Sequence, residues 1–230
     1  MVFESRRLTQ IVNESDIVIV DSSALRAGHA DLASQEEYFR EVRKVIGQDK
    51  RKIYTVREVV LELRTGGAPK ELAEINLRSK IKGPLKRKIN RSSIGEIAAY
   101  LKPLAVRLGV TYHTKKYRHT DVKLAALAFS FAQDSVNVAF LSSDRALNEL
   151  VYQTSQGLKN GKSNGFPYPL QGSVKPFSLV QRGGVFIPYQ EEREKIQEED
   201  FLDQRAALAE LANLKAWREQ RHNHRNYQDI

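Results

Sequence analysis

The chain contains no cysteine among its 230 residues. Disulfide bridges, thiolate zinc sites and cysteine nucleophiles are therefore excluded. Long apolar runs are also missing, since none approaches the roughly 18 residues that a membrane-spanning helix needs. The opening segment, MVFESRRLTQ, lacks the apolar core of a secretory signal. We therefore expect a cytoplasmic protein without a membrane partner.

Acidic residues are the scarcer charged class, with 28 Asp and Glu against 37 Lys and Arg, which gives a net charge of +9. The segment 64–91 alone holds nine Lys or Arg and two Glu. Basic clusters of this kind attract a phosphate backbone, although a basic face that contacts only solvent is the alternative. The candidate RNA contacts are Arg64, Lys86, Arg87, Lys88, Arg91, Lys115, Lys116 and Arg118.

Short apolar runs rich in β-branched residues alternate with segments of helical periodicity. Strands are predicted over 16–21, 52–55 and 136–141, and helices over 32–46, 56–64, 93–109, 121–132 and 145–152. Ser34 is a candidate N-cap of the first helix, and Thr55 with Glu58 forms a candidate capping box for the second. This order predicts an α/β fold of three layers, in which helices flank a central, mostly parallel sheet.

The composition changes three times along the chain. A basic insertion is expected over about 66–92, and a flexible loop rich in Gly, Ser and Asn over about 154–175. A strand pair, 177–179 with 185–187, follows around Gly183 and Gly184. We expect one domain over 14–190 and a charged helical arm over 191–230, which serves either as a docking element for a protein or ribonucleoprotein partner or as a solvated helix.

Four carboxylates fall at element boundaries or interrupt apolar segments. Asp21 ends the first strand, Asp121 opens a helix, and Asp144 follows the strand that ends at Leu141. Sites in open parallel sheets form outside the carboxyl ends of the strands, so the topology brings these residues together. Carboxylates in one crevice repel one another unless a cation shares them, which predicts a divalent metal site.

Each acid also has a purely structural interpretation. An Asp after a strand or at a helix start is commonly a turn or capping residue. Glu58 is assigned to the capping box and not to the metal site. Glu62 has no such duty and interrupts the apolar run Val-Val-Leu-Glu-Leu, where a buried carboxylate without a partner is costly.

The four stretches together resemble the PIN-domain family of metal-dependent ribonucleases over about residues 16–150. The first is a hydrophobic strand that ends in Asp21-Ser-Ser, and the second carries Glu62 in Val-x-x-Glu-Leu. Asp121 precedes an alanine-rich helix, as the family's third acid does. Asp144 stands in Leu-Ser-Ser-Asp-Arg-Ala-Leu, with Ser142 at the place where a hydroxyl residue helps to position the acids.

This resemblance implies a metal-dependent endoribonuclease that leaves 5′-phosphate and 3′-hydroxyl ends. The cluster would bind one or two Mg²⁺ or Mn²⁺ ions through oxygen ligands. Asp21, Asp121 and Asp144 are the expected ligands. Glu62 either binds metal or orients the attacking water, and Ser142 supports the cluster.

Within the family, IYTVREVVLELR is most similar to the branch that matures the 3′ end of small-subunit ribosomal RNA. That branch carries a zinc ribbon, which this chain has no cysteine to build. Two other interpretations stay open, a catalytically silent PIN-fold module that binds RNA or scaffolds a ribonucleoprotein, and a toxin-type PIN ribonuclease. A flap-type deoxyribonuclease would need a helical arch and helix-hairpin-helix signals, which are not evident.

Overall fold

The computed structural model describes residues 6–26, 37–38, 40–42, 44–45, 52–65, 91–110, 120–161, 165–180 and 185–200. The chain divides into two compact units, residues 1–190 and 191–230. In the second unit, residues 191–200 are helical. The expected arm beyond residue 200 and most of the expected basic insertion lie outside the described residues. All elements discussed below belong to the first unit.

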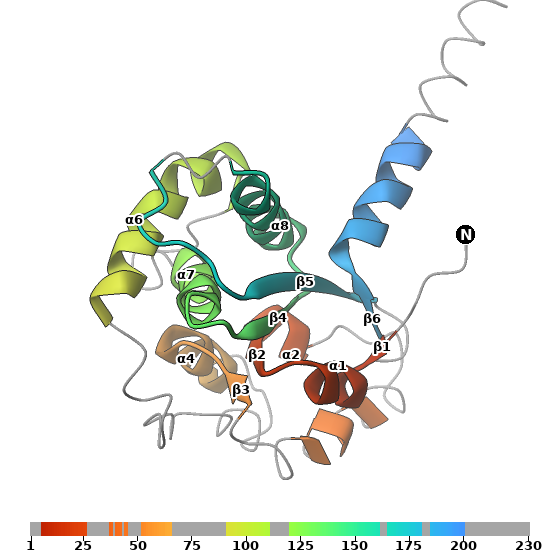
Figure 1. Ribbon diagram of the computed structural model, residues 1–230. Helices are drawn as coiled ribbons and strands as arrows, with labels where there is room; N and C mark the ends of the chain where they lie inside the picture. Colours follow the sequence, from red (N-terminus) through yellow and green to blue (C-terminus); the bar gives the residue numbers. More distant parts are fainter. Residues whose placement is uncertain are drawn as a thin grey trace, which may run out of the picture. The chain divides into compact units, whose positions relative to one another are not determined.

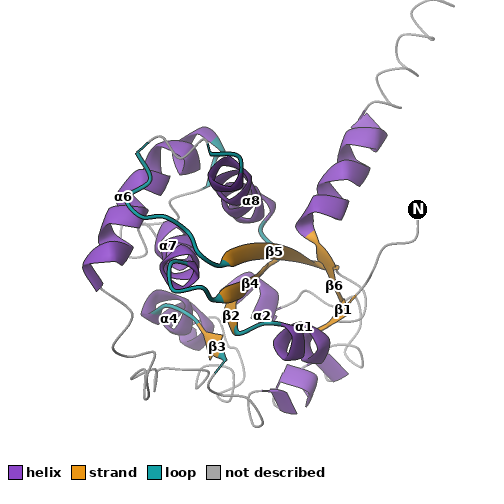
Figure 2. Ribbon diagram, in the orientation of Figure 1, coloured by secondary structure: helices purple, strands orange, loops and turns teal. Residues whose placement is uncertain are grey.

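A six-stranded, mostly parallel sheet forms the centre of this unit (Figures 1 and 2). Its strands lie in the order β1-β6-β5-β4-β2-β3. Neighbours among β3, β2, β4 and β5 pair in parallel, and β6 pairs antiparallel with both β5 and β1. The strands are β1 (Arg6–Arg7), β2 (Ile17–Val20), β3 (Ile53–Tyr54), β4 (Asn137–Ser142), β5 (Ser173–Val180) and β6 (Val185–Pro188).

Helices flank both faces of the sheet, with α7 and α8 on one face and α1 on the other (Figure 1). Helix α6 packs against α7 and α8, and α2 lies against α4 and β4. The helices are α1 (Leu8–Glu14), α2 (Ser22–Arg26), α4 (Arg57–Thr65), α6 (Arg91–Arg107), α7 (Thr120–Ala132) and α8 (Arg145–Lys159). Residues 37–38, 40–42 and 44–45 are also helical.

The core lies between the sheet and these helices. All four residues of β2 are buried, as are the last five of β4, because a central parallel strand is covered on both faces. The rings of Tyr54 in β3 and Phe131 in α7 lie 5.0 Å apart between centroids, which connects one edge of the sheet to the helix that covers it. The prediction of a mixed α/β fold with a central, mostly parallel sheet is confirmed.

The strand order places a topological switch point between β2 and β4. From β2 the chain leads to β3 on one side, and it later returns to β4 on the other side of β2. At such a point the two connections leave in opposite directions, and a crevice opens outside the carboxyl ends of the two strands. Asp21 directly follows β2, and Asp144 lies two residues beyond β4.

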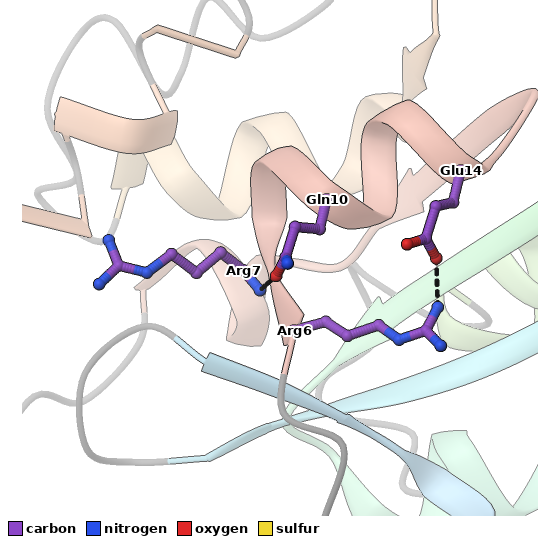
Figure 3. Close-up of polar contacts among 4 residues, drawn as sticks. All are labelled: Arg6, Arg7, Gln10 and Glu14. Carbon is purple, nitrogen blue, oxygen red and sulfur yellow. Dashed lines mark hydrogen bonds and ion pairs between the residues drawn. The ribbon is translucent and has the colours of Figure 1, made fainter.

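Strand β1 and helix α1 precede residue 14, where we expected the domain to start. Arg6 and Arg7 pair with Phe186 and Val185 of β6, and α1 buries apolar side chains against the core. The amide of Arg7 donates to the side chain of Gln10 over 2.8 Å, which satisfies one N–H at the start of α1 (Figure 3). A two-residue strand of arginines carries no hydrophobic signal, which explains why it was missed.

The loop expected over 154–175 is wrong at its two ends, where a helix occupies residues 154–159 and a strand occupies residues 173–175. Helix α8 continues to Lys159, and β5 begins at Ser173. Thr154 and Ser155 are buried because their hydroxyls donate to the carbonyl oxygens of Leu150 and Val174, at 2.8 and 2.9 Å. Internal hydrogen bonds thus let polar residues continue a helix where composition indicated a loop.

No helix in the described part of the chain combines the length and the apolar character needed to cross a bilayer.

Candidate active site

Asp21 occupies the carboxyl end of β2 and is only 5% exposed. Its amide donates to Leu141 of β4 over 2.9 Å, so the two strand ends remain paired as far as the site. Its carboxylate oxygen Oδ2 accepts from the amide and the hydroxyl of Ser23. Burial raises the pKa of Asp21 above its ordinary value, and these hydrogen bonds offset part of the rise.

Ser142, the last residue of β4, joins the two strand ends through its hydroxyl. This fully buried side chain donates to Oδ2 of Asp21 over 3.1 Å and accepts from the amide of Asp144 over 3.0 Å. Asn148 also contacts Ser142, since its side-chain amide donates to the carbonyl oxygen of Ser142 over 3.0 Å. Ser142 therefore contacts both Asp21 and Asp144, the two acids that follow the strand ends.

Asp144 is the N-cap of α8, as its structural interpretation anticipated. Its Oδ1 accepts from the amide of Leu147 over 3.1 Å, which satisfies one of the free N–H groups at the helix start. The same residue lies beside the carboxyl end of β2 through its link to Ser142. The side chain of Asp144 therefore caps α8 and also belongs to the acidic group.

Glu62 reaches the group from α4. Its Oε2 accepts from the hydroxyl of Ser22 over 2.8 Å, and Ser22 is the first residue after Asp21. The side chain is partly buried. A carboxylate 40 positions further along the chain therefore lies next to the end of β2.

Asp121, in the first turn of α7, completes the arrangement. Burial raises its pKa from 3.8 to about 7, and the negative charges of three neighbours add to the rise. Those neighbours are Asp21, Asp144 and Glu62. The other three acids thus lie within electrostatic range of Asp121, and the four together are called the carboxylate cluster below.

Glu58 lies outside the carboxylate cluster, as expected, but for a different reason. Helix α4 begins at Arg57, and the hydroxyl of Thr55 donates to the carbonyl oxygen of Val20 over 2.7 Å, so Thr55 is not the N-cap. Glu58 instead forms an ion pair with Lys123 of α7. Burial alone would raise the pKa of Glu58, but the hydrogen bond and charge of Lys123 lower it below its ordinary value.

Two serines were missed as members of the site. Ser22 donates to Glu62, and Ser23 both donates to Asp21 and accepts from the amide of Ser143 over 2.9 Å. The available signal was the position of two hydroxyl residues directly after a carboxylate at a strand end, because side chains at that position lie close to the carboxylate.

The chemistry of the donor atoms favours a divalent metal ion, whereas their spacing does not. Four carboxylates with neighbouring hydroxyls are hard oxygen donors, which suit Mg²⁺ or Mn²⁺. Yet among the residues that the structure describes, no three or more His, Asp or Glu side chains are grouped so that they could hold a metal ion. The donor chemistry fits a divalent cation, whereas joint coordination would require the side chains to move closer together.

The predicted RNA contacts fall largely outside the described residues. Arg64 lies in α4 and Arg91 opens α6. The other six, residues 86–88, 115–116 and 118, belong to segments that the structure does not describe.

The sequence matches no model of a known protein family, and a search of curated proteins finds no match.

Proposed function

We propose that the chain is a metal-dependent endoribonuclease of the PIN type, which hydrolyses phosphodiester bonds in structured RNA. The observation that supports this proposal is the hydrogen bonding at the ends of β2 and β4, where Ser142 contacts Asp21 and Asp144 and Ser22 contacts Glu62. Burial and, after it, the charges of these three acids raise the pKa of Asp121 to about 7. Such a concentration of like charge destabilises the folded chain unless a cation is bound there. The net charge of +9 over the whole chain makes a polyanion the fitting substrate.

A bound Mg²⁺ or Mn²⁺ would lower the pKa of an attacking water and stabilise charge on the scissile phosphate. Asp21 and Asp144 would supply ligands held in place by hydrogen bonds, since the carboxylate of Asp21 accepts from Ser142 and that of Asp144 accepts from the amide of Leu147. Asp121 would approach from α7 as a third ligand, and Glu62 from α4 either as a ligand or as the group that orients water. Ribosomal RNA is one structured RNA that such a site could process.

A catalytically silent RNA-binding module is the second candidate. The observation that favours it is the spacing of the acids, since within the described residues no three of them are grouped to hold one ion. Under this hypothesis the protein binds RNA with the same affinity in a divalent metal and in EDTA, and never cleaves it.

The deciding experiment compares wild type with Asp21→Asn and Asp144→Asn on end-labelled structured RNA, single-stranded RNA and DNA. Each assay is run in Mg²⁺, Mn²⁺ or EDTA. Asn is also a good N-cap, so Asp144→Asn removes the charge and retains the start of α8. Asp134→Asn is the matched control, because Asp134 lies after α7, in the turn before β4, at the other end of the sheet.

We expect wild type and Asp134→Asn to cleave RNA with Mg²⁺ or Mn²⁺, and both site variants to lose at least about 100-fold in rate. Cleavage of RNA by the two site variants at the rate of wild type would reject the assigned site. Binding of RNA without cleavage under every metal condition would establish the silent module in its place.

A further inference from the structure

Three cavities surround the second half of α8, of about 460, 240 and 510 Å³. The first two share Ser155, Lys159 and Val174, so they lie side by side along α8 and β5. The first and third share Leu158. We call the first two together the basic groove. Its volume suits small groups such as single nucleotides.

The charge of these linings is of one sign. Arg6, Lys159 and Lys175 line the basic groove, and Arg107 lines the third cavity. None of the residues that line the three cavities is Asp or Glu. A concave surface with cations and without carboxylates concentrates positive potential and favours an anionic ligand.

The two lysines are the cations best placed to bind such a ligand. Arg6 forms an ion pair with Glu14 of α1, which partly neutralises it (Figure 3). Lys159 and Lys175 are both exposed, and neither forms an ion pair within the described part of the chain. Lys159 lines both cavities and therefore lies at the middle of the basic groove.

Aromatic side chains form the other wall of the basic groove. Phe166 and Tyr168 line its first cavity, and both are partly exposed. The ring of Phe166 is fixed edge-on against Tyr100, with 5.1 Å between centroids. The hydroxyl of Tyr168 donates to Glu96 over 2.6 Å, and Glu96 does not line this cavity. Fixed aromatic rings beside free ammonium groups match a strand that carries bases and phosphates alternately.

The basic groove is separate from the carboxylate cluster. In the β4–β5 register, Ser173 pairs with Asn137 at one end and Ser178 pairs with Ser142 at the other. Ser173 and Val174 line the groove, whereas Ser142 contacts Asp21. Five residues of strand separate the two ends, which corresponds to about 17 Å. The groove extends along the second half of α8 and along β5 as far as Phe177, and none of the four acids lines it.

We propose that the basic groove is a second nucleic-acid site, which binds a single-stranded RNA segment away from the carboxylate cluster. The backbone lies against Lys159 and Lys175, and one or two bases stack beside Phe166 and Tyr168. This inference rests on the proposed function only for the choice of RNA as the anion. An RNA bound at both sites would be positioned for cleavage at the carboxylate cluster, and the basic groove would take no part in the chemistry.

The test measures the affinity of the full-length protein for a fluorescently labelled single-stranded RNA by anisotropy, in EDTA so that no cleavage occurs. The groove variant is Lys159→Glu with Lys175→Glu. The control is Lys44→Glu with Lys102→Glu, which makes the same change in net charge at two other exposed lysines, neither of which lines a cavity described above. Lys159→Arg with Lys175→Arg preserves both charges.

We expect the groove variant to bind at least about tenfold more weakly than the control variant, and the arginine variant to bind like wild type. The dependence of affinity on salt should also become shallower by about 1.4 in log–log slope, at roughly 0.7 per lost phosphate contact. Lys159 lies in the last turn of α8, so Lys159→Gln with Lys175→Gln is measured in parallel as a milder change for the helix.

Equal affinities of the groove and control variants would overturn the proposal. It would also be overturned if a polyglutamate peptide competed with RNA at equal charge concentration, because the groove would then recognise acidic protein. These outcomes are independent of the nuclease assay. A protein that never cleaves RNA, yet loses binding only in the groove variant, would retain the second site and lose the proposed activity.

Discussion

The hydroxyl of Ser142 donates to the carboxylate of Asp21 over 3.1 Å, although 121 positions separate the two residues in the sequence. The contact exists because β2 and β4 are parallel neighbours, so both strands end at the same edge of the sheet. The same hydroxyl accepts from the amide of Asp144. One buried serine therefore determines the spacing between two acids of the carboxylate cluster.

Replacing this serine should affect both stability and cleavage. Ser142→Ala leaves the amide of Asp144 without its acceptor and Asp21 without one donor, which should lower the free energy of unfolding by about 1–3 kcal/mol. Urea unfolding checks the stability, and the RNA assay checks the rate. Ser143→Ala is the control, because Ser143 is exposed and bonds through its backbone amide. Equal effects of the two substitutions would contradict the bridging role.

Two glutamates one turn apart on α4 should behave differently. Glu62→Gln should abolish or strongly reduce cleavage, because Glu62 belongs to the carboxylate cluster. Glu58→Gln should leave cleavage near the wild-type rate, because the partner of Glu58 is Lys123. Parallel RNA cleavage assays with both purified variants distinguish the two. A loss of activity in both would mean that the ion pair with Lys123, and not only the charge of Glu62, holds the site together.

The same ion pair should depend on pH. The pKa of Glu58 is lowered in the folded chain, so the pair contributes stability above the unfolded value of 4.5 and loses it as the pH falls through the lowered value. The pair is partly exposed, which limits its contribution to about 0.5–1 kcal/mol. Glu58→Gln should therefore destabilise the chain at pH 7, and this effect should shrink as the pH falls below 4.5, measured by thermal unfolding.

Asp121 should have the opposite effect on stability. Its pKa is 3.8 unfolded and about 7 folded, so between these values the folded chain binds a proton that the unfolded chain has released. Its contribution to stability therefore falls as the pH rises from 4 to 7. Asp121→Asn should raise the stability at pH 8 in EDTA by about 1–4 kcal/mol, and should have little effect at pH 4. Thermal unfolding at both pH values measures this.

Divalent metal provides the control for Asp121. Adding Mn²⁺ should stabilise wild type more than Asp121→Asn, since a bound cation relieves the repulsion that the substitution has already removed. If Asp121→Asn destabilises the chain in EDTA at pH 8, the carboxylate is not under electrostatic strain and the metal argument loses its main support.

Strongly patterned elements were predictable from the sequence. Strand β2 is a continuous apolar run that a parallel strand requires, and α7 begins at Thr120, within one residue of the helix predicted over 121–132. The central, mostly parallel sheet was expected from the alternation of strands and helices, whereas its strand order came from the structure. These predictions succeeded because burial on both faces of a sheet leaves a clear hydrophobic signal.

The missed features depend on contacts that leave no such signal. Strand β1 is held by pairing with β6, which a sequence of two arginines does not reveal. Helix α8 extends past Thr154 because that hydroxyl finds a carbonyl oxygen one turn earlier. The orientation of Ser22 and Ser23 depends on the turn after β2, so their hydrogen bonds could be found only in three dimensions.

Two glycine-to-alanine substitutions test how closely the segment before β5 packs against the segment before β4. A Cβ atom added to Gly172 would lie 2.1 Å from the carbonyl oxygen of Val136, so the backbones of two neighbouring segments would have to separate. Gly95 in α6 has no heavy atom within 4 Å of such a Cβ. Gly172→Ala should therefore destabilise the chain by more than about 2 kcal/mol, whereas Gly95→Ala should stabilise it by up to about 1 kcal/mol. Urea unfolding of both variants decides, and a stable Gly172→Ala chain would show that the β4–β5 register differs from the one described.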